Sequence, residues 1–471
     1  MATVQTNDIR VQNARNLIDC LTSNPSYTFI GKPTAWENES SPPVPDNSIK
    51  EFYKVHDDML TLKKINTTDA VHMIKRQTWS TGAVYDLYRH DYNKDNPAFS
   101  TATNLRDANY YVVNSLGDVY VCLDNNLNAR STVEPQLKNN TPFTTSDGYQ
   151  WLLIYSILSS EMRDYSTTNY IPVYEMTSPR PAGELTTIVI DNPGVGYTNN
   201  PSGYPNGVTY YYVPITGNGT GAAARVLVNN GRVTEVDVVR GGEGYTYANM
   251  SFVRGNCYAS LADLDLEANG LDPLGLETFR NTVLISPPGG WGYDVEGQLN
   301  ASKVGIFSDL RYDLSDIIKD VTFRQTGILL NPESTGAETL SAVYAINLVI
   351  TSGQEFVVGT EVEQVVTDGT AKGLVVACDH MNNILRIVQD PELHADEDGN
   401  LYHFGGSEEI TGTAVGTPIN FTGSLEDLNF VGGYAEPEIT KYTGELIYLT
   451  NLRPVKREET QSERISFVIA F

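Results

Sequence analysis

The sequence predicts a mainly β protein with a few α-helices and more than one domain. From Tyr110 onward the apolar residues recur with a period of two, as in a pleated strand. Short runs of β-forming residues are separated by Gly, Asn and Asp turns, and the last segment alternates in the same way. Together these observations favour sheets over helices.

The last eight residues, 464–471, read as a closing strand. Ile465 and Phe467 share one face with the other odd-numbered residues, and Val468 falls on the opposite face. Ser466 is the only polar residue after Ile465. We therefore expect a strand that is hydrogen-bonded inside a sheet and buried on both faces.

A second strand is expected just before it, at residues 445–450. Residues 451–454 should break this strand, because Pro454 lacks the N–H that a ladder needs. The mostly charged segment 456–464 fits a solvated connection better than a binding site.

Composition excludes several classes of protein. The net charge of -26 and pI of 4.5 disfavour binding to nucleic acid or to anionic membranes. The hydrophobic content of 40% includes no run of about 18 apolar residues, so no membrane-spanning helix is expected. The first twenty residues contain no apolar core of a secretory signal. The basic pairs Lys63-Lys64 and Lys75-Arg76 are interpreted as helix surface.

The cysteines are too dispersed for a metal knuckle or a disulfide framework. We expect four reduced thiols in a protein that folds in cytosol. They stand at Cys20, Cys122, Cys257 and Cys378.

The N-terminal part should combine two helices with one strand. Residues 8–22 have apolar side chains at helical spacing, and residues 26–31 read as a strand. A Pro-rich connection follows over 32–47, with Trp36 as a packing anchor. Ser48 should cap a helix that runs to about Lys64, on which His56 is a surface or core residue rather than a ligand.

A hairpin is the clearest signal in the next part. Residues 110–123 read as two strands joined by the turn 115–118, which contains Gly117. Further strands are expected at 150–158 and 170–175.

Residues 181–280 contain an internal repeat. Segment 186–198 matches 234–246, each with a strand, a Gly-x-Gly turn and Tyr-Thr, at a spacing of 48 residues. Neither Gly-x-Gly turn fits a phosphate-binding loop, because neither has the required spacing. We expect glycines with positive φ in a separate β domain.

Residues 341–430, which we call the third segment, contain short β-type runs that suggest a compact barrel or sandwich. The expected strands are 346–350, 355–358, 373–378 and 384–388. Its acidic turn places Asp396, Asp398 and Asn400 at the first three ligand positions of a calcium loop, but Gly399 is out of place. A solvated turn is favoured, and a bound ion stays the alternative.

No catalytic motif is present among the nucleophile elbow, zinc-protease, CxxC and kinase patterns. Glycoside hydrolysis needs only a pair of carboxylates, and in a chain with 58 acidic residues the presence of two such residues gives no evidence for that activity. The sequence therefore assigns no catalytic, cofactor-binding or metal-binding residue.

Seven stretches resemble, in the same order, the baseplate wedge subunit of T-even-like contractile-tailed bacteriophages, the gene-eight product family. The likeness covers residues 26–176, 320–332 and 437–471. The stretches are SYTFIGKPTAWENESSPPVPDN, IKRQTW, YVVNSLGDVYVCLDNN, DGYQW, TNYIPV, TFRQTGILLNP and YTGELIYLTNLRPV.

This resemblance implies a mainly β wedge-protein core, a β-sandwich with a few peripheral α-helices, which is interrupted by two small inserted all-β domains. The core would comprise residues 1–180, 281–336 and 437–471, with insertions at 181–280 and 337–436. It also implies a homodimer without catalytic activity or cofactor, in the tail baseplate of the virion and assembled in the host cytoplasm.

The expected partners are the core-bundle and peripheral or rim subunits of the wedge, with no nucleic acid and no membrane. The insertions either contact tail-fibre or peripheral baseplate proteins or have no partner. The alternative function is a tail-associated carbohydrate-binding protein or depolymerase that acts through the inserted domains.

Overall fold

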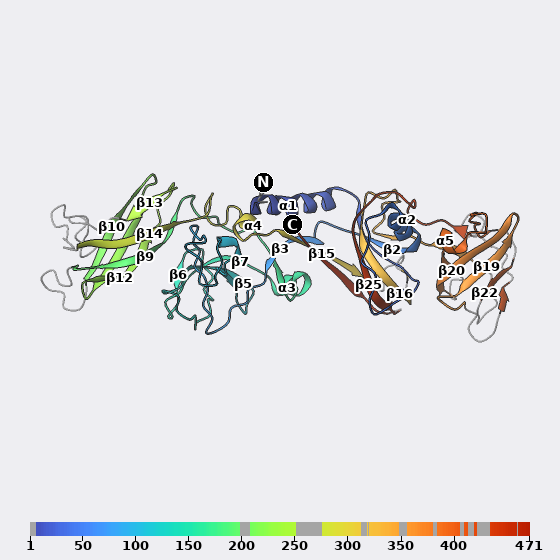
Figure 1. Ribbon diagram of the computed structural model, residues 1–471, viewed down its shortest axis with the longest axis horizontal. Coiled ribbons are helices and arrows are strands. Elements are labelled where there is room, and N and C mark those ends of the chain that lie inside the picture. Colours follow the sequence, from blue (N-terminus) through green and yellow to red (C-terminus); the bar gives the residue numbers. More distant parts are fainter. Residues whose placement is uncertain are drawn as a thin grey trace. The chain divides into compact units, whose positions relative to one another are not determined.

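The protein is mainly β, with 42% of its residues in strands and 12% in helices, which confirms the expected fold class. It is described by a computed structural model, whose elements Figure 1 labels. The described residues are 6–197, 208–250, 276–311, 318, 320–347, 356–379, 384–405, 409–412, 419–421, 434–458 and 460–471.

The chain divides into two compact units. The first unit comprises Met1–Ala14, Val71–Val304 and Ala470–Phe471, and the second comprises Arg15–Ala70 and Gly305–Ile469. The α-helices are α1 (Asn7–Ser23), α2 (Ile49–Asp58), α3 (Ser159–Tyr165), α4 (Val295–Gln298) and α5 (Pro391–His394), with a 3₁₀ turn η1 (Leu105–Asp107).

The hairpin of the first unit forms as expected. A four-stranded antiparallel sheet has the order β4-β5-β7-β6, and β3 pairs with β8. Gly117 has φ 86°, so it supplies the left-handed residue that the turn between β4 and β5 needs. These strands are β3 (Ala70–Lys75), β4 (Tyr111–Val113), β5 (Asp118–Asp124), β6 (Phe143–Thr144), β7 (Gln150–Ser156) and β8 (Tyr170–Pro172).

The internal repeat folds around its own buried cluster, which contains both Tyr197 and Tyr245. The four Gly-x-Gly glycines have φ between 63° and 81°, which confirms the expected positive φ. One sheet has the order β12-β11-β10-β13, and β9 pairs with β14. The domain boundary expected at residue 280 falls within β14. The strands are β9 (Leu185–Val195), β10 (Val208–Gly217), β11 (Ala223–Asn229), β12 (Arg232–Arg240), β13 (Ala248–Met250) and β14 (Leu276–Ile285).

The second unit has a five-stranded sheet of order β17-β2-β1-β16-β25, whose last two strands lie side by side in Figure 1. Strand β1 pairs with β16 from Ser26↔Leu330 to Gly31↔Gln325. The strands of this unit begin with β1 (Ser26–Gly31), β2 (Met59–Lys64), β15 (Lys303–Leu310), β16 (Val321–Leu330) and β17 (Thr339–Ser341).

Helix α2 corrects one expectation. Ser48 caps it and accepts a hydrogen bond from Glu51 N, as the sequence indicates, but the helix ends at Asp58 and not near Lys64. Residues 59–64 instead form β2, which pairs with β1 on one side and β17 on the other. The basic pair Lys63-Lys64 therefore lies on a strand and not on a helix surface. Lys75 likewise ends strand β3.

The two closing strands differ from the sequence-based expectation. β25 (Glu445–Arg457) does not break at residues 451–454, because it is the edge strand and its pairing with β16 shifts register around Pro454. An edge strand with a bulge tolerates a missing N–H. β26 (Glu463–Ala470) lies at the end of its sheet, beside β15, and only Phe467 is buried. It is a strand, as expected, but it is not buried on both faces.

The segment between these strands is not simply solvated. Arg457 is fully buried, and its guanidinium donates to Glu463 and to the backbone oxygens of Leu310, Ile318 and Gln461 at 2.6 to 3.4 Å. This side chain therefore ties both closing strands to the core of the second unit.

The third segment, residues 341–430 with β24, forms a seven-stranded sheet of order β23-β22-β19-β20-β21-β18-β24. Its buried cluster includes Phe356, Val375 and Phe404. Parts of the expected strands 346–350 and 355–358 lie outside the described residues. The strands are β18 (Tyr344–Asn347), β19 (Glu361–Val366), β20 (Gly369–Asp379), β21 (Ile384–Val388), β22 (Ile410–Gly412), β23 (Ile419–Phe421) and β24 (Tyr434–Ala435).

Candidate functional site

A cleft of about 1030 Å³ lies in the first unit. We call it the repeat cleft, because strands β9 and β12 of the repeat form one wall. The other wall comes from residues 87–99, the end of β5 with the following turn, and β7. The cleft therefore lies between the hairpin sheet and the repeat.

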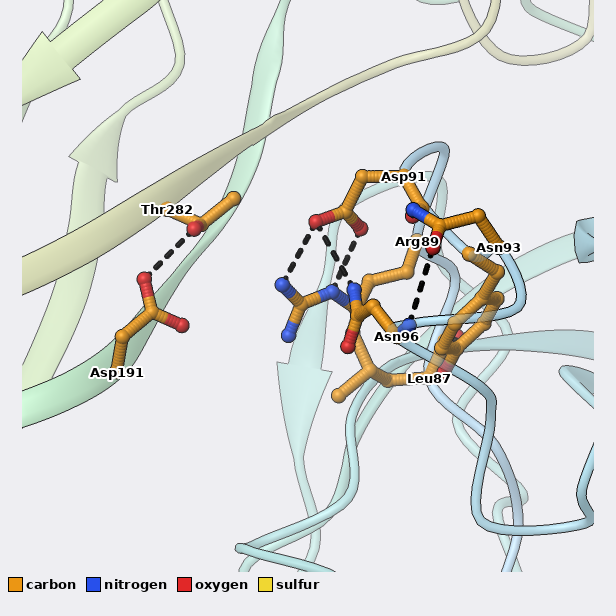
Figure 2. A network of polar contacts seen from close by, with 8 residues as sticks. Leu87, Arg89, Asp91, Asn93, Asn96, Asp191 and Thr282 are labelled. Carbon is orange, nitrogen blue, oxygen red and sulfur yellow. Dashed lines mark hydrogen bonds and ion pairs between the residues drawn. The ribbon is translucent and has the colours of Figure 1, made fainter. Parts of the chain in front are cut away.

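An ion-paired network holds one wall in place, as Figure 2 shows. Arg89 donates to both carboxylate oxygens of Asp91, at 2.7 and 2.8 Å, and Asn96 donates to the same carboxylate at 3.2 Å. These hydrogen bonds lower the pKa of Asp91 and raise that of Arg89. Both groups are therefore ionised at neutral pH, and the wall is polar and rigid.

The repeat wall carries acidic groups around one arginine. Arg225 donates to Asp237 at 2.9 Å and to Glu235 at 3.2 Å. The hydrogen bond between the two carboxyl groups raises the pKa of Glu235. Nearby, Asp191 accepts a hydrogen bond from Thr282 at 2.7 Å and points toward Arg89 (Figure 2).

The turn after β5 forms a strained rim of the cleft. Asn126, Leu127 and Asn128 have φ of 50°, 55° and 62°, three successive residues in the left-handed region. Asn tolerates this conformation, whereas Leu pays about 1–2 kcal/mol for it. Side-chain and backbone hydrogen bonds of Asn125 and Asn128 hold the turn, and Leu127 is left 79% exposed.

The hydrogen-bonding chemistry of the cleft suits binding. Asp124 lies on the floor, where burial raises the pKa of its carboxyl group. The side chain of Gln150 makes no hydrogen bond with any described residue. Within the described part of the chain, no three His, Cys, Asp or Glu side chains lie close enough together to hold a metal ion. The cleft thus presents hydrogen-bond donors and acceptors from both of its walls.

A smaller pocket of about 510 Å³ lies in the second unit, between α2 and the turn at Tyr442. Tyr442 has φ 65°, and its hydroxyl donates to Asp57 at 2.5 Å. Glu392 forms ion pairs with Lys50 and Lys54 across the opening. The pocket is thus closed by charged groups from α2 and α5.

Buried ionisable groups lie behind this pocket. Burial lowers the pKa of His56 to about 4 and raises the pKa of Asp57 to about 6. Burial also raises the pKa of Asp58, whose carboxylate forms a 3.0 Å ion pair with Lys32. His56 is a core residue in edge-to-face contact with Phe52, which is one of the two environments expected for it.

The acidic turn of the sequence is held by its own hydrogen bonds. Asp396 accepts from the backbone N–H groups of Asp398 and Asn400 and from the hydroxyl of Tyr402. Gly399 has φ 86° and lies in the turn itself. The favoured interpretation as a surface turn matches this geometry.

The remaining residues weighed from the sequence are placed as follows. Trp36 anchors its loop by donating to the backbone oxygen of Leu452 at 3.0 Å. Cys20, Cys122 and Cys378 are free thiols, and Cys257 lies outside the described residues. No helix in the described ranges has both the length and the apolar character needed to cross a membrane.

Sequence reasoning did not identify the repeat cleft, because its residues come from six separate segments between residues 87 and 239. The one local signal was the run DNNLN at 124–128, in which Asn residues fit left-handed positions. Comparison with protein-family models and with curated proteins gives no match.

Proposed function

We propose that this chain is a structural subunit of a contractile-tail baseplate wedge. It works as a homodimer that links neighbouring wedge proteins, catalyses no reaction, and is assembled in the host cytoplasm into the virion. The proposal rests on the ordered resemblance described above, and one structural observation supports it.

That observation is the way the resembling stretches pair with one another. In the second unit, three of them become β1, β16 and β25, which are adjacent strands of one sheet. The pairing is continuous, since Thr326 of β16 lies opposite Ile30 on one side and Thr450 on the other. Segments that are far apart in the sequence thus form one structural nucleus, as a shared ancestral core requires.

The first unit has a second nucleus of the same kind. The stretch IKRQTW contributes the end of β3, and TNYIPV contributes β8, which pairs with it at Ile74↔Ile171 and Lys75↔Tyr170. The stretch YVVNSLGDVYVCLDNN contributes β4 and β5, and DGYQW contributes the start of β7, the strand beside β5. The seven separate stretches therefore contribute strands to three sheets.

The blocks without resemblance have buried clusters of their own. The repeat packs around Tyr197 and Tyr245, and the third segment packs around Phe356 and Val375. A block with its own core can be inserted into an older fold without rebuilding it. This supports the interpretation of both blocks as insertions.

The surface also suits a part that joins proteins. Large apolar side chains are exposed at scattered positions, while the net charge of -26 keeps the free subunit soluble. Tyr53 and Tyr442 are in edge-to-face contact and each is about half exposed, which is typical of residues that anchor interfaces.

Native mass spectrometry over micromolar concentrations tests the dimer, and an image reconstruction of the assembled particle tests the location. We expect a dimer mass and density for this chain within the baseplate. A chain that stays monomeric throughout, or that is absent from the baseplate density, would contradict the proposal.

A further inference from the structure

The repeat cleft has the size and lining of a ligand site. Its volume of about 1030 Å³ lies at the upper end of the range of about 300–1,000 Å³ for ligand pockets. Both walls alternate amide, carboxylate and guanidinium groups with aliphatic side chains such as Leu87 and Val236. The volume of the cleft therefore accommodates an oligomer, and its many polar side chains disfavour a lipid or a steroid.

The polar groups on its walls are fixed before any ligand arrives. The pair Arg89–Asp91 and the cluster of Arg225, Glu235 and Asp237 are each held by side-chain hydrogen bonds. A ligand that binds them does not need to order them, which lowers the entropic cost of binding. Bidentate carboxylates and amides at fixed spacing are suited to vicinal hydroxyl groups, each of which donates and accepts one hydrogen bond.

The rim adds an apolar contact. Phe99 lines the cleft and is 56% exposed, and Leu127 on the facing turn is 79% exposed. Exposed rings next to polar groups favour ligands that have an apolar face and a polar edge. A pyranose ring combines such a C–H face with a rim of hydroxyl groups.

The charge of the cleft selects against anionic ligands. Its two arginines are already paired with Asp91 and with Glu235 and Asp237, and Asp124 adds a further acid on the floor. An acidic sugar would meet more carboxylates than unpaired cations, which is repulsive at short range.

We propose that the repeat cleft binds a neutral oligosaccharide of several pyranose units, with Phe99 stacking on one ring and the amide of Gln150 and the carboxylate of Asp237 binding hydroxyl groups. This binding site is independent of the role in the baseplate, and it requires no bond to be cleaved.

Binding of the full-length protein to maltohexaose, cellohexaose, laminarihexaose and chitohexaose is measured by saturation-transfer NMR and calorimetry, with hexagalacturonate as the charged counterpart. We expect at least one neutral hexasaccharide to bind with a Kd below about 1 mM, a typical weak-ligand affinity. Phe99→Ala should weaken that binding about tenfold, the worth of one aromatic contact. Gln150→Ala should weaken it by a smaller factor.

The control is Leu116→Ala, which removes an equally exposed apolar side chain from the turn between β4 and β5, outside the cleft. Its affinity should equal that of the unaltered protein. The proposal is overturned if no neutral hexasaccharide binds, if hexagalacturonate binds more tightly, or if Phe99→Ala and Leu116→Ala have the same effect. Melting curves of each variant separate loss of binding from loss of folding.

Discussion

Replacing Arg457 by methionine tests whether the buried guanidinium ties the closing strands to the second unit. Arg457 is fully buried and donates to Glu463 at 2.6 Å, to Ile318 O at 3.0 Å and to Leu310 O at 3.2 Å. Methionine keeps an unbranched chain of similar length, so the cavity left behind is small. The loss therefore reports mainly on the acceptors that remain unpaired.

Removing one partner of a buried ion pair costs about 3–5 kcal/mol, because the other charge stays buried without compensation. This figure already includes the cost of neighbouring acceptors left without a donor, which is about 1–3 kcal/mol for a buried carbonyl that cannot reach water. We therefore expect Arg457→Met to lower the unfolding free energy of the second unit by about 3–5 kcal/mol. The double variant R457M/E463L should recover part of this loss, since it also removes the carboxylate of Glu463, which the single variant leaves without its partner.

Hydrogen exchange of the amides in β25 and β26 under native conditions is the suitable assay, because the two units need not unfold together. Arg453→Met is the matched control, since Arg453 is exposed on the same strand, and it should change the opening free energy by less than about 0.5 kcal/mol. A loss below about 1 kcal/mol for Arg457→Met, or one equal to the control, would refute the reasoning.

The remaining predictions concern pH, a glycine turn and the closing strand. Asp57 has a raised pKa, so its contribution to stability is complete below about pH 4 and is lost as pH rises through about 6. His56 has a lowered pKa, so its contribution is complete above pH 6.5 and is lost as pH falls through about 4. The two trends oppose each other, so Asp57→Asn should make the melting temperature rise from pH 4.5 to 6.5 more steeply than in the unaltered protein; an identical pH profile would count against this. Gly242→Ala should lower the unfolding free energy measured in urea more than Gly82→Ala does, because of these two only Gly242 has backbone atoms that the new Cβ would overlap. Gly82→Ala should cost about 1 kcal/mol for its positive φ alone. Deleting residues 465–471 removes a strand that buries one aromatic ring, so the protein should become insoluble on expression; a soluble truncation with unchanged melting would contradict it.

Local signals in the sequence predicted the parts of the fold that depend on few residues. Strand β1 was expected at its observed bounds, and the positive φ of Gly194 and Gly242 follows from turn chemistry. The end of α2 could not be predicted, because residues 59–64 have helical spacing and become a strand only through pairing with β1 and β17. Tertiary pairing thus overrides local preference.

The same limit applies to the closing strands and to the site. Pro454 normally ends a strand, and only the position of β25 at the sheet edge makes it acceptable. Burial of Arg457 and the only partial burial of β26 depend on neighbours that no local pattern specifies. The repeat cleft is formed by segments between residues 87 and 239, so its composition is visible only after folding.

The composition of the five-stranded sheet has a consequence for synthesis on the ribosome. Thr326 donates its hydroxyl hydrogen to the backbone oxygen of Phe29, a contact across 297 residues of chain. At roughly 5–20 residues per second, β1 therefore waits about 15–60 s for β16 to emerge, and longer for β25. During that interval β1 can pair with β2 on one edge only, and its other edge has no native neighbour, so a nascent chain in this state is prone to aggregate. Efficient production of this protein should then depend on chaperones that shield early strands, whereas the β4–β5 hairpin can form as soon as it leaves the tunnel.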